Sequence, residues 1–386
     1  LNTSVNEVII PARSFSLQEN QSYEVEVIFE IREQEEQLDF TTTVKVASLP
    51  NPTTDNGQWL PGDLHIHSTY SDGKKSVADV RDMMKDRGYR FVYLTDGHHT
   101  GKLLAPGWDS YMNAVAAVSQ QDSVTSIFPG METTVGVGKH EGHMTAYGLS
   151  SIDGLEDKTI SPQQGIDIVA ARNPEAPSSS SVAHATNPFL PWKDYTVIGH
   201  TGMELMMLWP GAGRDLDAAL VKDWRSEVAR HLDNAITGTG TFPSARTGTD
   251  FHGSITSPSP EPYVTWVYSA KNWDGDPPLD HYQRKATIDL GLHNGHTIAS
   301  FQGSFALMTL DGKIPGSIIR NVPANSVLPI SLEFQSARNG NYRLRVFRNN
   351  VQETVFERSC GGVKAGDCLR WQGEITFPGG NQYYWL

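Results

Sequence analysis

Two short motifs in this 386-residue chain carry histidines at the spacing of metal ligands. His65 and His67 in GDLHIHS lie two residues apart, and so do Asp250 and His252 in TGTDFHG. Side chains at positions i and i+2 of a β-strand project from the same face, so each pair can reach one ion. Imidazole and carboxylate groups together suit zinc, manganese or iron. Each motif therefore predicts part of a metal site.

Five more ligand-type side chains lie between the two motifs. Asp72 follows the first motif in a turn that can return to it. The others stand near the ends of short apolar runs and are His98, Glu132, His143 and His184. A single residue of this kind is more often a packed or solvated polar group. Nine of them, spaced strand by strand, favour one shared site.

The segments that must position these residues alternate between strand and helix from residue 63 to about 300. FVYLTD, SIFPGMETT, HMTAYGL, SVAHAT and GMELMMLW are typical of strands. Residues 76–89, 110–121, 163–172 and 217–232 are typical of helices. This alternation predicts an α/β fold with a mostly parallel sheet, closed as a barrel. In such a barrel the carboxyl ends of the strands meet at one mouth, where the nine candidates would converge.

The two ends of the chain have a different pattern. SYEVEVIFEI and DFTTTVKVASL near the start alternate apolar and polar residues, as do VLPISLEFQS and YRLRVFRN near the end. Alternation of this kind predicts antiparallel strands. We therefore expect an N-terminal β module at 1–58, a barrel at 59–300 and a C-terminal β-sandwich at 301–386.

The order of the motifs resembles that of the polymerase and histidinol phosphatase (PHP) superfamily of metallohydrolases. HxHS, SDG, TD followed by His, GMETT, GHMTAYG, AHATNP and TDFHG occur in this order within residues 63–255. More narrowly, the chain resembles the secreted branch with flanking β modules that includes carbaryl-hydrolase-like enzymes. The resemblance implies a distorted (β/α)7 barrel and two or three divalent ions, zinc, manganese or iron.

The resemblance also implies which residues hold each ion. The first ion would be bound by His65, His67, Glu132 and Asp250, and Glu132 would bridge to a second ion held by His143 and His184. A third would be held by Asp72, His98 and His252. The second motif departs from the family, because TDGHH has Gly97 where a histidine is expected. A loop or bulge could bring His98 or His99 to the third ion instead.

A hydroxide held at Glu132 and Asp250 is the expected nucleophile, because divalent ions lower the pKa of bound water towards about 7. With three carboxylates and this hydroxide, three ions leave a net charge of about +2 and two ions about 0. The first charge suits a phosphate ester, and a small phosphomonoester or phosphodiester is our leading substrate class. The second suits a carboxylic ester, an amide or a carbamate, which is the alternative, or a phosphodiester that is helped by other groups.

A phosphate substrate is normally contacted by arginine or lysine as well. Arg246, Arg172 and Lys139 are the candidates, although each can equally be a solvated surface cation. The chain contains neither a GxSxG elbow nor a GxxxxGK[ST] loop. A serine hydrolase and an ATP-dependent enzyme are therefore unsupported.

Composition limits the partners. The 31 Lys and Arg against 44 Asp and Glu give a formal charge of −13, which disfavours a nucleic acid polymer. No apolar run approaches the roughly 18 residues of a membrane span. A small-molecule substrate fits best. A protein of another class, one that binds carbohydrate or a surface without catalysis, is the alternative suggested by two β modules.

Two features favour an exported protein, periplasmic or secreted. The chain begins at Leu1, as expected of a mature product from which a signal peptide has been removed. Cys360 and Cys368 in CGGVKAGDC could close a disulfide across a hairpin, which we favour over two separate thiols. Disulfides persist in oxidising compartments.

Overall fold

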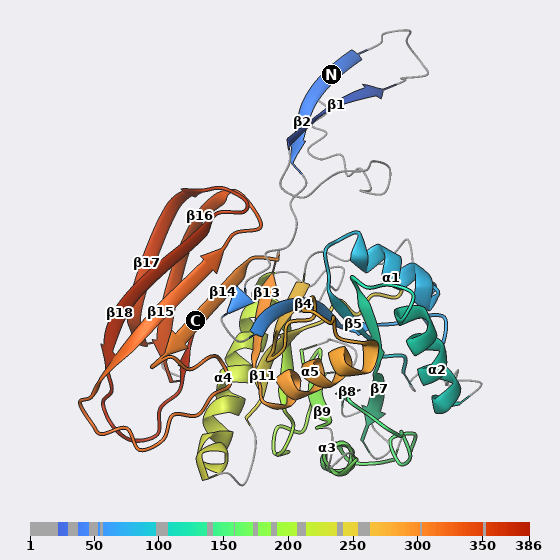
Figure 1. Ribbon diagram of the computed structural model, residues 1–386. Coiled ribbons are helices and arrows are strands. Elements are labelled where there is room, and N and C mark those ends of the chain that lie inside the picture. The colour runs from blue at the N-terminus through green and yellow to red at the C-terminus, as the bar shows by residue number, and fades with distance from the viewer. Residues whose placement is uncertain are drawn as a thin grey trace.

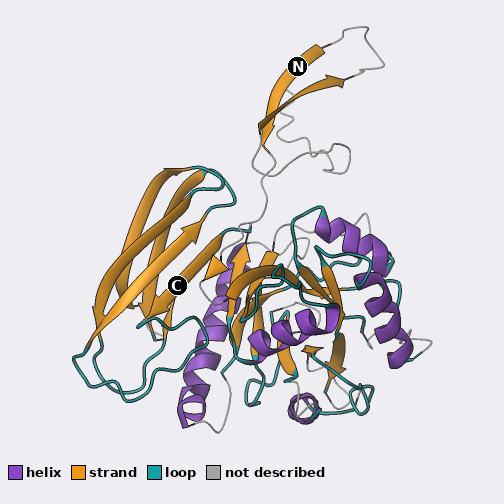
Figure 2. Cartoon of the chain, viewed as in Figure 1, coloured by secondary structure: helices purple, strands orange, loops and turns teal. Residues whose placement is uncertain are grey.

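The computed structural model describes most of the chain from residue 57 onward and three strands before it. The described ranges are 22–29, 38–45, 53–54, 57–97, 107–136, 142–157, 159–172, 177–186, 191–206, 214–237, 242–253, 263–301, 303–349 and 353–386. Figures 1 and 2 show a central part of sheets and helices beside a separate stack of strands. Within the described residues, no helix has the length and apolar character needed to cross a membrane.

The first central sheet has the order β13-β12-β4-β5-β6, with β3 paired to β4. The strands are β3 (Thr53–Thr54), β4 (Gly57–Ile66), β5 (Phe91–Leu94), β6 (Ser126–Pro129), β12 (Tyr263–Ser269) and β13 (Thr297–Phe301). β4, β5 and β6 run parallel, whereas β12 is antiparallel to both β4 and β13. β4 is buried along its whole length, which places the HxH motif at its end inside the protein.

The second central sheet has the order β11-β10-β9-β8-β7. Its strands are β7 (Met131–Val135), β8 (Gly142–Tyr147), β9 (Ser179–Ala183), β10 (Gly202–Met206) and β11 (Ser244–Thr247). β9, β10 and β11 are parallel neighbours, and β8 is antiparallel to β7 and β9. The expected parallel arrangement is therefore confirmed only in part.

A closed barrel is not seen in the described residues, where strand pairing forms these two sheets. The sheets do meet at one end. Ile66 and Phe251 form a parallel bridge, and the backbone N–H of Glu132 donates to the carbonyl of Thr95 at 3.1 Å. The strand ends that carry the predicted ligands are therefore brought together without a continuous ring of paired strands.

The helices lie against the sheets and begin at clear sequence signals. They are α1 (Val77–Lys85), α2 (Trp108–Ser119), α3 (Pro162–Ala171), α4 (Arg214–Thr237) and α5 (His281–His293). Ser76 and Asp79 form a capping box at the start of α1, and Ser161 and Gln164 form one at α3. The first four helices fall where the sequence predicts them. α5 and the strands before and after it in the chain, β12 and β13, were not predicted. Asp280, a residue type that often caps helices, caps the start of α5.

The C-terminal strands form two three-stranded antiparallel sheets. One has the order β14-β15-β18 and the other β17-β16-β19. The strands are β14 (Phe305–Leu310), β15 (Val327–Gln335), β16 (Gly340–Arg348), β17 (Glu353–Val363), β18 (Cys368–Thr376) and β19 (Tyr384–Trp385). Ile330, Leu332, Leu344 and Val346 belong to an apolar cluster of their own. At the other end of the chain, β1 (Ser22–Phe29) pairs antiparallel with β2 (Leu38–Lys45), as the alternation predicts.

The predicted disulfide is wrong, because Cys360 and Cys368 are free thiols. Cys360 lies within β17, which continues to Val363, and Cys368 begins β18 in the other sheet. The glycine-rich segment is thus the crossing between two sheets, not a hairpin turn. The Cys360 thiol contacts the carbonyl oxygen of Tyr342 at 3.6 Å instead.

Candidate metal centre

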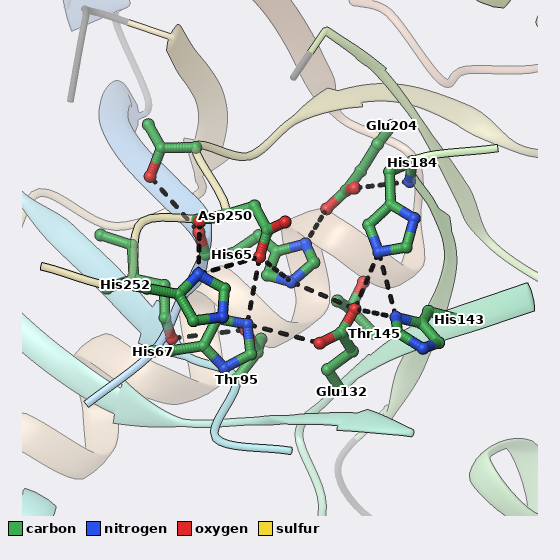
Figure 3. Close-up of polar contacts among 12 residues, drawn as sticks. His65, His67, Thr95, Glu132, His143, Thr145, His184, Glu204, Asp250 and His252 are labelled. Carbon is green, nitrogen blue, oxygen red and sulfur yellow. Dashed lines mark hydrogen bonds and ion pairs between the residues drawn. The ribbon is translucent and has the colours of Figure 1, made fainter. Parts of the chain in front are cut away.

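Eight of the nine predicted metal ligands come together at the junction of the two central sheets, and all but Asp72 are labelled in Figure 3. They are His65, His67, Asp72, Glu132, His143, His184, Asp250 and His252. His98, the ninth, lies outside the described residues, as does the candidate cation Lys139. The eight side chains form three overlapping groups, and in each group one ligand atom from every residue lies within 4.8 Å of the others.

Backbone hydrogen bonds bring the two i, i+2 motifs together. The N–H of His67 donates to the carbonyl of Phe251 at 3.0 Å, and the N–H of Asp250 donates to the carbonyl of His65 at 2.8 Å. Gly248 permits this approach, since a Cβ there would lie 2.3 Å from the Cβ of His65. The two motifs therefore behave as adjacent short strands and present their ligands to the same space.

The first group contains His65, His67, Glu132 and Asp250, all of them buried except the partly exposed Asp250. Nε2 of His65 lies 3.3 Å from Oδ1 of Asp250 and 3.4 Å from Oε1 of Glu132, and has no hydrogen-bond partner. Nε2 of His67 lies 3.2 Å from the same Asp250 oxygen. Ligands of a tetrahedral zinc ion are about 3.3 Å apart, given metal–ligand bonds of about 2.0 Å. The group therefore fits a transition-metal ion.

The second group shares Glu132 with the first. Oε1 of Glu132 lies 2.7 Å from Nδ1 of His143 and 2.9 Å from Nε2 of His184. These two ring nitrogens are 3.1 Å apart. His143 comes from β8 and His184 follows β9, the neighbouring antiparallel strand. One carboxylate thus faces two sets of imidazoles, the arrangement that a bridging ligand needs.

The third group, His67, Asp72 and His252, lies towards solvent. Oδ2 of Asp72 is 3.3 Å from Nε2 of His252, and the side chains of these two residues are 27% and 28% exposed. The rings of His67 and His252 stack with centroids 4.2 Å apart. His67 directs Nε2 at the first group, so only its Nδ1 faces Asp72, at 3.5 Å. This group therefore forms the accessible side of the centre.

The charges of the buried groups depend on one another. Burial opposes ionisation of Glu132, but the neighbouring imidazoles, first of all His143, hold its pKa well below the usual value. Burial also opposes protonation of His67, yet the carboxylates of Asp250 and Glu132 raise the pKa of His67 to about 10. Positive charge is therefore strongly favoured here. A divalent ion would supply it in place of protons.

Two buried carboxylates that sequence analysis did not select hold the ligands in place. Oε1 of Glu204 lies 2.9 Å from Nδ1 of His65, and its other oxygen accepts the backbone N–H of His184 at 2.9 Å. Asp63 accepts the N–H of His65 at 3.0 Å and the hydroxyl of Thr249 at 2.7 Å. Burial raises the pKa of Asp63 to about 7. One sequence signal could have identified Glu204, because it is the only acidic residue in the otherwise apolar strand sequence GMELMM.

The TD motif has a positioning role in the structure. Asp96 accepts hydrogen bonds from the backbone N–H and hydroxyl of Ser68, at 2.7 and 2.6 Å, and from the hydroxyl of Ser71 at 2.7 Å. These bonds anchor the turn between His67 and Asp72. Asp96 thus supports the ligands from the adjacent strand end.

Two of the ligands have a backbone conformation that L-residues seldom adopt. φ is 30° at His184 and 52° at Asp250. Left-handed conformations at residues other than glycine are strained and cluster at functional sites. In both cases the surrounding hydrogen bonds hold the residue in place, through Glu204 for His184 and through the carbonyl of His65 for Asp250.

The two described candidate cations do not lie at the centre. Arg246 on β11 is fully buried, and its guanidinium donates to the carbonyls of Thr201 and Leu292 at 3.0 and 2.7 Å. Gly202 makes room for it, since a Cβ there would lie 2.2 Å from its Nε. The expected phosphate contact is therefore corrected to a structural role.

Arg172 is also placed elsewhere. It follows α3 and donates to the hydroxyl of Ser151 at 2.9 Å and to Asp153 at 3.4 Å. β8 begins beside the centre at His143 and ends at Tyr147, so Ser151 follows the end of β8 that is remote from the ligands. The prediction that Arg172 contacts the substrate is corrected accordingly.

No family model and no curated protein matches the chain. A two-domain protein from Bacteroides vulgatus containing a predicted PHP-like metal-dependent phosphoesterase is 14% identical at a TM-score of 0.48, over 86% of this chain and 90% of that one. An amidohydrolase from Chromobacterium violaceum is 17% identical at a TM-score of 0.30, and the match covers 50% of this chain and 87% of that one. A protein from Bifidobacterium adolescentis described as a metal-dependent phosphoesterase is 14% identical at a TM-score of 0.29. This match covers 50% of this chain and 89% of that one.

The structural neighbours thus include a protein with a predicted PHP-like phosphoesterase, a protein described as a phosphoesterase and an amidohydrolase. None of the three is described as a carbaryl hydrolase, so the narrower resemblance is without support here. Similarity at this level assigns no chemistry to the present chain, which has to be argued from its own site.

Proposed function

We propose that the chain is a metal-dependent hydrolase of small phosphoesters, either monoesters or diesters. The observation that carries this proposal is the position of Glu132 between two groups of histidines. Its Oε1 lies 2.7 Å from Nδ1 of His143, while its Oε2 lies 3.3 Å from Nε2 of His67. A carboxylate shared in this way suits a pair of divalent ions, zinc, manganese or iron.

Bound divalent ions would lower the pKa of a coordinated water and polarise the phosphoryl oxygen. The protein's own residues supply position and charge. Glu132 and Asp250 present negative oxygens towards the interior of the centre, and Glu204 holds the ring of His65 so that Nε2 faces them. Asp72 and His252 lie on the more exposed side, where a substrate can approach.

The substrate class depends on the third group. If Asp72 and His252 take part in holding an ion, the net charge of about +2 favours a phosphate ester. A second candidate function is hydrolysis of a carboxylic ester, an amide or a carbamate. It is favoured by the burial of Arg246, which removes the expected partner of a phosphate from the centre.

The test is turnover of 4-nitrophenyl phosphate, bis(4-nitrophenyl) phosphate and 4-nitrophenyl acetate by metal-supplemented protein. Asp250→Asn is the variant of interest, and Asp109→Asn is its control because Asp109 is an exposed residue at the start of α2. We expect hydrolysis of a phosphate ester that a chelator and Asp250→Asn abolish and that Asp109→Asn preserves.

Other outcomes separate the alternatives. Metal-dependent hydrolysis of the acetate alone would replace the phosphoester proposal by the second candidate. Equal phosphate turnover in Asp250→Asn and the parent would refute a reaction at this centre. Glycan binding with no turnover of any ester would favour the non-catalytic alternative.

A further inference from the structure

A second cluster of ligand-type residues lies outside the proposed centre and shares no residue with it. His200 lies two residues before β10, while Glu227 and His231 lie on α4 at positions i and i+4. Residues four apart on a helix project from the same face, so Glu227 and His231 both reach the start of β10. The ligand atoms of all three lie within 4.8 Å of one another.

The cluster is buried more deeply than most ionisable groups. His200, Glu227 and His231 are 1%, 4% and 2% exposed. Nε2 of His231 is buried without a hydrogen-bond partner. A buried ring nitrogen without a hydrogen-bond partner destabilises the fold, unless a group such as a metal ion contacts it. Arg230 also pairs with Glu227, from the more exposed side of the helix.

The Glu227–His231 distance within the cluster matches the spacing of ligands around an ion, and the Glu227–His200 distance is somewhat longer. Oε2 of Glu227 lies 3.4 Å from Nε2 of His231 and 3.8 Å from Nε2 of His200. Hydrogen bonds between nitrogen and oxygen are shorter, mostly about 2.7–3.2 Å. Neighbouring ligands of tetrahedral zinc are separated by about 3.3 Å. The two imidazole rings are almost perpendicular, at 86°, with centroids 5.6 Å apart.

This position is separate from the proposed catalytic centre. Glu204 is the residue of β10 that contacts His65 and His184. His200 precedes it by four residues, which corresponds to about 13 Å along an extended chain. An ion at His200 would therefore lie towards the opposite end of the same strand.

We propose that His200, Glu227 and His231 bind a structural divalent transition-metal ion, with zinc as the best match to two imidazoles and one carboxylate. A water can take the fourth position. The ion would fasten α4 to the start of β10. This proposal does not depend on the activity of the other centre.

The helix that the ion would hold also contacts the C-terminal strands (Figure 1). The hydroxyl of Tyr383 donates to the carbonyl of Arg225 on α4 at 3.1 Å. The guanidinium of Arg225 lies 5.2 Å from the centre of the Trp385 ring, and Trp224 meets the same ring edge-on at 6.2 Å. Fixing α4 would therefore also stabilise the attachment of the C-terminal module.

The first test counts metal ions in the full-length protein. The double variant Glu227→Gln/His231→Gln is compared with Glu156→Gln/His293→Gln, which removes the same two side-chain types outside both clusters. After equilibration with zinc and removal of excess, metal per chain is measured by plasma mass spectrometry, with circular dichroism to confirm folding. We expect the first variant to bind one zinc ion fewer than the parent and the control to bind the same number. Equal zinc content in all three folded proteins would overturn the proposal.

A second measurement covers the case in which the double variant does not fold. Crystals of the unsubstituted protein are grown with zinc, and anomalous diffraction is recorded at the zinc absorption edge. We expect a peak between His200, Glu227 and His231 besides any peak at the other centre. Zinc peaks at the other centre with none at these three residues would overturn the proposal.

Discussion

Oε1 of Glu204 lies 2.9 Å from Nδ1 of His65, on the side of the ring opposite the Nε2 that faces Asp250. The same carboxylate accepts the backbone N–H of His184 through its second oxygen. One buried side chain thus orients ligands in two groups of the proposed metal centre. Partners of this kind set the tautomer and direction of a ligating imidazole.

Replacement of Glu204 should weaken metal binding without removing any ligand. We expect Glu204→Ala to reduce zinc affinity by about 10- to 100-fold, the usual effect of losing such a partner. Glu204→Gln should lose less, because one amide oxygen can still accept one of the two hydrogen bonds. Competition with a chromophoric chelator measures the affinity, and Glu156→Ala, at an exposed position, is the control. Unchanged affinity in Glu204→Ala would show that His65 needs no such support.

Asp250 combines a ligand carboxylate with a left-handed backbone, and two substitutions can separate these roles. Asp250→Asn and Asp250→Ala should both abolish turnover, since each removes the negative oxygen near His65 and His67. At φ of 52°, Asn is better tolerated than Ala. Asp250→Ala should therefore be the less stable of the two by about 1 kcal/mol. Urea unfolding of the metal-free variants measures the difference. Equal midpoints would argue against strain at this position.

Arg246 should matter for stability and not for substrate affinity. Arg246→Ala leaves the buried carbonyls of Thr201 and Leu292 without their donor and opens a cavity. We expect a loss of about 3 kcal/mol in the free energy of unfolding. Arg172→Ala is the control, because its partner Asp153 is exposed and such pairs contribute less than about 1 kcal/mol. A variant of normal stability whose KM for a phosphate ester is raised at least tenfold would restore Arg246 as a substrate contact.

His281 at the start of α5 should make the protein less stable in mild acid. Burial, together with the nearby charge of Lys285, lowers the pKa of His281 to about 4. Between pH 6.5 and about 4 the unfolded chain binds a proton at this residue that the folded chain does not. The contribution of His281 to stability is therefore complete above pH 6.5 and is lost as the pH falls towards 4.

The substitution His281→Gln should remove this pH dependence. Urea midpoints at pH 7 and pH 5 are compared for the parent, His281→Gln and the control His293→Gln. We expect the midpoint of the parent to fall further between these pH values than that of His281→Gln. Identical falls in all three proteins would contradict a depressed pKa at His281.

Most of the residues of the proposed metal centre could be predicted because their signals are local. Two ligands at i and i+2 of a strand share a face whatever the rest of the fold does, which holds for His65 and His67. The end of a short apolar run also marks a strand end, and this located Glu132 and His143. The same local logic identified four of the five helices in the described part of the chain.

Long-range contacts were beyond prediction from one sequence. Cys360 and Cys368 are close along the chain, yet the sequence does not show that the strands carrying them belong to different sheets. Arg246 lies four residues from Asp250, but its guanidinium is enclosed by residues from distant segments, Thr201 and Leu292.

The residue types and their order therefore follow from the sequence, whereas their partners follow from the tertiary structure. Glu204 lies 139 residues from His65 along the chain. Glu227 lies on α4, whose sequence has the pattern of an ordinary amphipathic helix. Only the pairing of strands and the packing of α4 against β10 bring such groups within bonding distance. Once there, burial gives these contacts their strength, because a buried charge has no water to replace its partner.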